Sequence, residues 1–173
     1  MNITIDKNSD LVVAADIGGS NIRVALVDLK GNILEKQIIR TNPSRGIENA
    51  GYEISKIIYS ISKLRSIKGI AYSSAGPINQ ITGQYINPPN LTGWHNKSLI
   101  PIIKDNLKID SREFIKVGHD ATLAALAEKQ FGKNKGSNNI IYLTVSFAID
   151  AIAVPEIYFQ LNDFLIYLFL VLF

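Results

Sequence analysis

The feature that most constrains the fold is a change in hydrophobic period close to residue 47. Residues 11–17 are apolar except for Asp16, residues 21–28 alternate between apolar and polar side chains, and residues 33–40 form a third extended segment after a turn. From Ile47 to Leu64 the apolar residues recur with helical spacing instead. The short links between the first three segments predict an antiparallel meander of three strands that leads into a helix.

The remainder of the sequence alternates between strand and helix patterns. We expect a strand at 67–73, a helix near 98–107, a strand at 114–118, a helix at 120–131 and a strand at 139–145. Residues 79–96 are rich in Pro, Gly and Asn and predict a long loop, and long loops in compact domains are often functional. The order of elements predicts an α/β fold with a mixed sheet.

Composition narrows the class of protein. The 173 residues, 47% of them hydrophobic and 19% charged, are typical of one globular domain. The net charge of +3 is spread along the chain without a basic block, so we expect no nucleic-acid partner. The sequence has no Cys, which excludes disulfides, Cys-bound zinc and thiol nucleophiles from this segment. No signal-peptide pattern opens the chain, and we expect a cytoplasmic protein.

The end of the sequence is strongly apolar. Residues 164–173 contain no polar side chain except Tyr167. A membrane-spanning helix needs about 20 apolar residues, and Gln160, Asn162 and Asp163 interrupt any extension of this run. We therefore expect no membrane span, and we expect this run to limit solubility.

The first motif that carries chemistry lies between the first two strands and reads Asp16-Ile17-Gly18-Gly19-Ser20-Asn21. Two glycines permit a tight turn and close approach of a ligand, and successive N–H groups in such a turn bind anions. Ser20 adds a hydroxyl donor, and Asp16 is placed to orient Mg²⁺ through water. The same residues also fit an ordinary Gly-rich hairpin turn with a capping Asp.

Two further motifs are associated with the long loop: one directly precedes it and the other lies in its second half. Residues 73–77 (Ser-Ser-Ala-Gly-Pro) follow a buried strand, at the strand end where α/β folds bind ligands, but they also fit a plain Gly-Pro turn. Within residues 87–94, Asn90 offers a donor and an acceptor that suit sugar hydroxyls. Trp94 either walls a pocket or anchors the core.

The fourth motif places His119 and Asp120 between a strand and an Ala-rich helix. A carboxylate at the mouth of a pocket can act as a general base for a hydroxyl that attacks a phosphoryl group. Asp at this position is also a common helix N-cap, and His119 fits a packed or surface histidine.

The order and spacing of these motifs resemble the ROK family (repressor, open reading frame, kinase) of sugar kinases, which are related to hexokinase and actin. The resemblance covers about residues 11–146. The segments that carry it are 16–28 (phosphate loop and second strand), 75–77 (the family's Pro-Gly-Pro loop), 90–94 (Asn-Leu-x-Gly-Trp) and 118–128 (Asn-Asp and the following helix). It implies an actin-like ATPase (ribonuclease H-like) domain with helices on both faces of the sheet.

The resemblance also implies an activity, namely ATP-dependent phosphorylation of the primary hydroxyl of glucose or a close analogue. Asp120 would be the catalytic base, and the sugar would contact Gly76, Asn90, His119 and Asp120. The ATP phosphates would face Gly18, Gly19, Ser20 and Asn21, with Mg²⁺ held through water near Asp16. An intact relative is compatible with a homo-oligomer.

The chain departs from the family pattern at three places. His119 stands where the family usually has Asn, and Ala75 replaces a Pro. After Ser146 the family continues with a Gly-rich turn into a second domain, whereas this chain reads Phe-Ala-Ile-Asp-Ala-Ile-Ala-Val-Pro-Glu. The zinc segment of many relatives and the adenosine pocket lie beyond that point in the family, so we expect no zinc site here.

These departures predict two segments. Residues 1–146 would form the N-terminal actin-like domain, and residues 147–173 would be an atypical apolar tail in place of the start of the second domain. We expect the tail to arise from a frameshift or early stop, with a natural short variant as the alternative. We expect the chain to be an incomplete, inactive kinase, with a non-catalytic sugar-binding or inert fragment as the alternative. Since only about ten residues precede the first strand, we do not expect the helix-turn-helix of a family regulator.

Overall fold

A five-stranded mixed sheet forms the centre of the molecule. The computed structural model describes residues 1–62, 65–131, 133, 139–145 and 149–154. The strands are β1 (Leu11–Ile17), β2 (Asn21–Asp28), β3 (Ile33–Arg40), β4 (Ile70–Ser74) and β5 (Ile115–His119), arranged in the order β3-β2-β1-β4-β5. The first three are antiparallel neighbours, and β4 and β5 run parallel to β1. The predicted meander is therefore confirmed.

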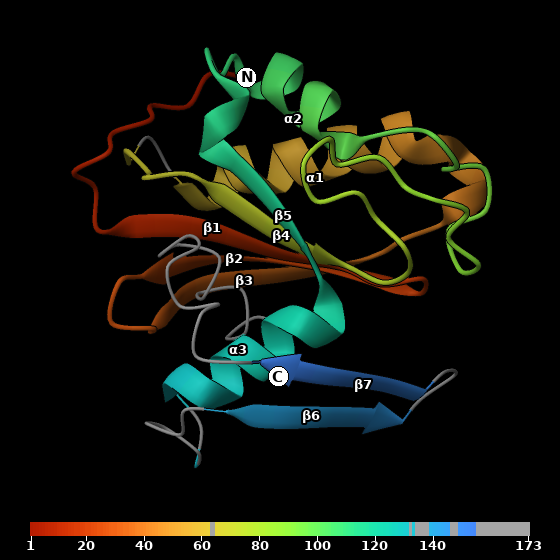
Figure 1. Cartoon of the computed structure of the whole chain (residues 1–173). Helices are drawn as coiled ribbons and strands as arrows, with labels where there is room; N and C mark the ends of the chain where they lie inside the picture. The colour runs from red at the N-terminus through yellow and green to blue at the C-terminus, as the bar shows by residue number, and fades with distance from the viewer. Residues whose placement is uncertain (63–64, 132, 134–138, 146–148, 155–173) are drawn as a thin grey trace.

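Helices cover both faces of this sheet (Figure 1). Helices α1 (Gly46–Ser62) and α2 (Leu99–Leu107) lie on one face, and α3 (Asp120–Phe131) lies on the other. Because β1 is covered on both sides, its residues from Leu11 to Ala15 form a continuous apolar run instead of an alternating one. Val13, Ala15 and Ile17 belong to the core under α1 and α2, whereas Val12 and Ala14 belong to the core under α3.

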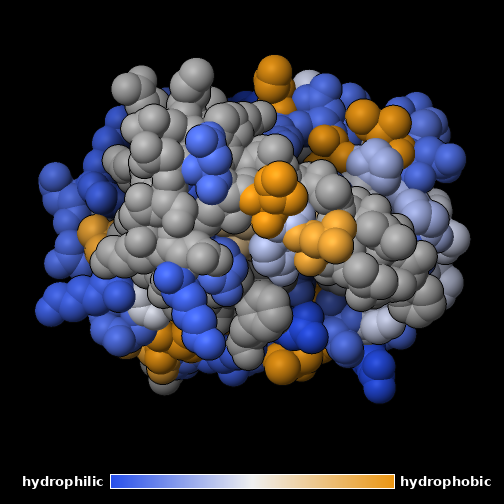
Figure 2. Space-filling view, turned by 60° about the horizontal axis from the view of Figure 1, so that its bottom comes forward, coloured by the Kyte–Doolittle hydropathy of each residue, from blue (hydrophilic) through white to orange (hydrophobic). Residues whose placement is uncertain are grey.

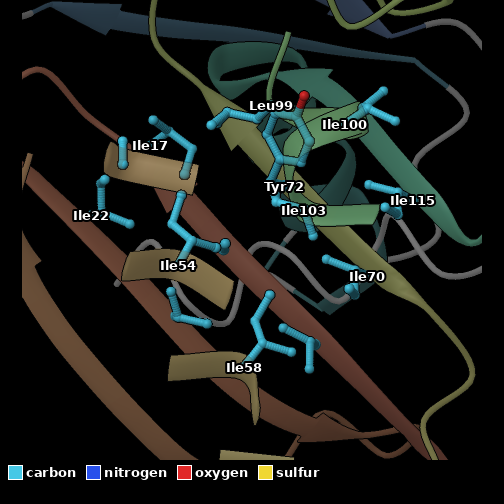
Figure 3. Packing of buried hydrophobic residues seen from close by; sticks show 14 of the residues in the cluster. Ile17, Ile22, Ile54, Ile58, Ile70, Tyr72, Leu99, Ile100, Ile103 and Ile115 are labelled. Atoms are coloured by element: carbon cyan, nitrogen blue, oxygen red, sulfur yellow. The ribbon is translucent and has the colours of Figure 1, made fainter. Parts of the chain in front are cut away.

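The larger core is built mainly from isoleucines of the sheet and of α1 and α2. Figure 3 shows side chains from the two layers pointing toward one another, among them Ile22, Ile54, Ile70, Ile103 and Ile115. The helical spacing of apolar residues from Ile47 places one face of α1 in this core. The position of Leu64 at the end of that pattern lies outside the described residues.

Two short 3-10 helices, η1 (Pro43–Arg45) and η2 (Arg112–Phe114), complete the links between elements. The predicted strand at 67–73 begins later than expected, at Ile70. Ile67 is fully buried, but it forms an isolated parallel bridge with Ile5 near the N-terminus. The ladder between β4 and β1 runs only from Ile70 to Ser74. Ile67 is therefore buried outside the sheet, beside the N-terminal segment, and not as a residue of β4 as the pattern predicted.

The predicted strand at 139–145 is present as β6 (Ile140–Val145), but it does not join the central sheet. It pairs antiparallel with β7 (Ile149–Val154), a strand that the sequence pattern did not predict. This hairpin packs on α3, beyond the central sheet (Figure 1). Ile141 and Leu143 of β6 are exposed, and Figure 2 shows apolar side chains at the surface on this side of the molecule.

None of the helices in the described part of the chain has the length and apolar composition that a membrane-spanning helix needs. The apolar run at 164–173 lies outside the described residues, so the prediction about its solubility stays a prediction.

The central role of α1 in the core can be tested with a matched pair of variants. Ile54 is fully buried, whereas Ile38 on β3 is 57% exposed. We expect Ile54→Ala to lower the free energy of unfolding by about 2–5 kcal/mol, because it removes buried methylenes and leaves a cavity. Ile38→Ala should cost less than about 1 kcal/mol. Urea denaturation measures both, and equal effects would contradict the layer arrangement.

Candidate functional site

The carboxyl ends of the three parallel strands meet at one edge of the sheet. The ladder register places Asp16 of β1 beside Ser73 of β4, and Ser73 beside Gly118 of β5. One residue further along, Ile17, Ser74 and His119 are aligned in the same way. Asp120 follows directly as the first residue of α3. In open α/β sheets this edge is where ligands bind.

Asp16 is the buried charge of this edge. Its side chain is 8% exposed, and its two carboxylate oxygens accept hydrogen bonds from different partners. The Ser73 hydroxyl donates to Oδ1 at 2.9 Å, and the Arg23 guanidinium donates to Oδ2 at 2.8 Å. Burial raises the pKa of Asp16, the two hydrogen bonds oppose that rise, and the charge of Asp120 adds to it. The two carboxylates therefore belong to one electrostatic site.

The turn between β1 and β2 is held in a defined shape next to Asp16. The Gly18 N–H donates to the Asn21 carbonyl at 3.0 Å. Thr41, just after β3, donates from its hydroxyl to the Gly18 carbonyl at 2.6 Å and from its N–H to the Ser20 carbonyl at 3.1 Å. Ser20 is exposed at the tip. The exposed Ser20 is thus held on a fixed turn at the same edge as Asp16.

The loop of residues 75–96 lies against this turn. A Cβ added to Gly19 would come within 2.7 Å of the Asn90 Cβ, so the absence of a side chain permits the contact. Gly76 has a φ of +88°, a backbone conformation that favours glycine. A Cβ added to it would lie 3.2 Å from the Cβ of Pro88 in the same loop. Asn90 is exposed, whereas Trp94 is fully buried. Of the two alternatives for Trp94, the structure supports the core anchor.

His119 and Asp120 lie half-buried at the start of α3. Their Nε2 and Oδ1 atoms are 3.5 Å apart, and the side chains are 24% and 37% exposed. Asp120 Oδ1 also accepts a hydrogen bond from the Ala121 N–H at 2.8 Å. The carboxylate therefore stabilises the helix start and remains accessible to solvent, so a capping contact does not remove it from the candidate site.

The structure brings the predicted residues to one edge, in two groups around Asp16 and Asp120. It adds two that the sequence reasoning did not select, Arg23 and Ser73, because both act through Asp16. Their signal was available in part: a hairpin in which Ile17 pairs with Ile22 also pairs Asp16 with Arg23. The partner from β4 requires the parallel register, which the sequence does not reveal.

The residues present fit a magnesium ion only through water. Both oxygens of Asp16 are already hydrogen-bonded, and Mg²⁺ characteristically keeps several waters. Within the described part of the chain, no group of three or more His, Asp or Glu side chains could hold a metal ion directly.

Fold and site together define an actin-like ATPase domain of the sugar-kinase class. The sequence model of the ROK family matches residues 12–149, and the chain belongs to this family. A glucokinase from Thermotoga maritima is 28% identical over 138 residues, which are 80% of this chain and 42% of the glucokinase.

Solved structures agree with this assignment. A ROK hexokinase from Thermus thermophilus superposes with a TM-score of 0.72 at 25% identity, over 84% of this chain and 47% of the hexokinase. A ROK family glucokinase from Streptomyces griseus, solved with glucose and AMPPNP, has the same TM-score at 23% identity, over 84% of this chain and 45% of its own. The chain thus spans less than half the length of each of these three relatives.

The buried charge of Asp16 gives a pH dependence with a definite sign. Because its pKa in the folded protein is raised above 3.8, the folded state binds this proton more tightly than the unfolded state does. Stability therefore falls as the pH rises from 3.8 through the raised pKa. We expect the stability of the wild type relative to Asp16→Asn to increase as the pH is lowered from 7 toward 3.8.

Asp28→Asn is the matched control. Hydrogen bonds from Asn32 lower the pKa of Asp28, so its contribution is present above 3.8 and is lost as the pH falls below that value. Thermal denaturation at a series of pH values measures both differences. A trend of the same sign for the two variants would contradict the account of Asp16.

Proposed function

We propose that this chain provides the sugar-binding half of an ATP-dependent hexose kinase, with glucose or a close analogue as acceptor. The observation that supports it best is the gathering of two carboxylates, a Gly-rich turn and an Asn-bearing loop at one edge of the sheet. Membership of the ROK family and the similarity to glucokinases agree with this proposal.

Asp120 is the proposed catalytic base. Its half-exposed carboxylate lies at the edge, where it can accept the proton of the sugar's primary hydroxyl as that oxygen bonds to the γ-phosphorus of ATP. The bond from the γ-phosphorus to the bridging oxygen breaks, and ADP leaves. Bound Mg²⁺ would neutralise charge on the phosphates. The carboxylate of Asp16 would orient that ion through its water shell, and the turn of residues 18–21, with the exposed Ser20 hydroxyl, would face the phosphate oxygens.

The sugar is proposed to lie between the 75–96 loop and the start of α3. Asn90 supplies an amide donor and acceptor, Gly76 allows close approach of the loop backbone, and Asp120 accepts the reacting hydroxyl's proton. His119 offers one donor or acceptor where relatives usually have an amide, so it would tune the choice among hexoses. We further propose that residues 1–146 are the functional domain and that residues 147–173 replace the start of a second one.

Glucose binding tests the acceptor site without any need for catalysis. In calorimetric titration we expect glucose to give a saturable signal with the 173-residue chain. Asn90→Ala should weaken binding by at least about fivefold, the size of one lost hydrogen bond. Lys30→Ala, in the exposed turn between β2 and β3, is the control and should change nothing. A folded chain that binds no hexose would reject the proposal.

Catalysis tests the role of Asp120. Phosphoryl transfer requires acceptor, donor and Mg²⁺ to be held together, and the chain spans only part of its relatives, so we expect no turnover from the 173 residues alone. Residues 1–145 joined to the remaining portion of the Thermotoga maritima glucokinase should phosphorylate glucose. In that fusion Asp120→Asn should lower kcat by at least about a hundredfold, with little change in glucose affinity.

Near-normal turnover of the Asp120→Asn fusion would show that Asp120 only caps α3. Turnover of ATP by the 173-residue chain with glucose would show instead that the chain is catalytically sufficient. If neither polypeptide turns over but glucose still binds, a non-catalytic sugar-binding role accounts for the observations.

A further inference from the structure

Strand β4 ends with two adjacent, fully buried hydroxyl groups, Ser73 and Ser74. Successive residues of a strand point to opposite faces of the sheet. Ser73 therefore lies on the α3 side, where it donates to Asp16, and Ser74 lies on the side of α1 and α2. The family resemblance assigned no role to either serine.

The hydroxyl of Ser74 has its shortest hydrogen bond with an aromatic side chain of the 75–96 loop, while the carbonyls of Ala75 and Ile17 lie further away, at 3.4 and 3.5 Å. The Ser74 hydroxyl donates to the hydroxyl oxygen of Tyr85 at 3.0 Å, and both residues are fully buried. The Tyr85 ring meets Trp94 edge to face, with ring centroids 5.3 Å apart and an interplanar angle of 76°. One hydrogen bond thus connects the end of β4 to the aromatic pair inside the loop.

The backbone around Tyr85 ties together the two arms of the same loop. The Tyr85 N–H donates to the Lys97 carbonyl at 3.0 Å, and its carbonyl accepts from the Asn96 N–H at 2.9 Å. The next residue, Ile86, donates its N–H to the Pro77 carbonyl at 2.8 Å. A shift of Tyr85 would therefore move both the Gly76 arm and the segment that carries Asn90.

We propose that Ser74 and Tyr85 are positioning residues for the hexose: their hydrogen bond fixes the 75–96 loop relative to β4 and so sets the place of Gly76 and Asn90. Neither side chain touches the sugar. The identity of the ligand rests on the proposed function, whereas the effect on the loop does not. Loss of the Ser74 hydroxyl leaves a buried phenol without this partner, which is costly and favours displacement of the loop.

Ser73 provides a matched control. It is the neighbouring residue of the same type, is equally buried, and also donates to a buried oxygen, but its partner is Asp16 on the opposite face. Ser73→Ala and Ser74→Ala therefore remove the same atoms from the same strand end. Only the second acts on the 75–96 loop.

The experiment uses the 173-residue chain and its single tryptophan, Trp94. Glucose affinity is measured by calorimetry, and Trp94 emission is recorded without ligand. We expect Ser74→Ala and Tyr85→Phe each to weaken glucose binding at least about fivefold and to shift Trp94 emission to longer wavelength. Ser73→Ala, which acts on Asp16 on the opposite face of the sheet, should leave the Trp94 emission unchanged. The double variant Ser74→Ala/Tyr85→Phe should bind glucose no more weakly than the single variant with the lower affinity. The two effects do not add, because both substitutions remove the same hydrogen bond.

The outcomes separate this inference from the proposed function. If the wild type binds no glucose, the proposed function fails, and the emission of Trp94 alone decides whether Ser74 positions the loop. Equal effects of Ser73→Ala and Ser74→Ala on affinity and emission would overturn the inference, as would a Ser74→Ala variant that matches the wild type in both. Should Ser74→Ala fail to fold, Tyr85→Phe, which keeps the ring packing, takes its place in each comparison.

Discussion

The parallel register of β1, β4 and β5 is the constraint on which the rest of the structure depends. It ends three strands at the same level, so that residues far apart in sequence, Asp16, Ser73 and Asp120, meet at one edge. Layers of helices on both faces fix this register, because a slip of one residue would exchange the apolar contents of the two cores. The chemistry proposed for the edge is therefore a consequence of how the sheet is packed.

Burial of a charged carboxylate at this edge of the sheet has an unfavourable desolvation free energy. The hydrogen-bond partners of Asp16 reduce this free energy without removing it. The serine and the guanidinium satisfy its oxygens, yet burial together with the nearby charge of Asp120 still raises its pKa. A carboxylate whose oxygens are both hydrogen-bonded can still orient a cation through the water shell of that ion. On the function proposed above, the same arrangement would suit a magnesium-bound phosphate ligand.

Much of the fold could be predicted from hydrophobic period alone. The bounds of β1, β2 and β3 agree with the sequence pattern, since strand length and apolar periodicity coincide there. Strand β7 could not be predicted, because Ile149–Val154 contains alanines and an aspartate, which have low strand propensity, and its stability comes from pairing with β6. The roles of Arg23, Ser73 and Tyr85 depend on cross-strand and loop contacts, for which a single sequence carries only the weak signal of hairpin register.

The central claim is that one edge of the sheet, and no other surface of the described chain, receives the hexose. The most direct measurement is a two-dimensional ¹H–¹⁵N NMR titration of the 19.1 kDa chain with glucose. The account predicts that the largest shifts fall on the amides of Gly19, Gly76, Asn90, His119 and Asp120. The amides of β3 and of the turn at residues 29–32 should stay in place. Shifts confined to β3, or to the β6–β7 hairpin, would contradict it.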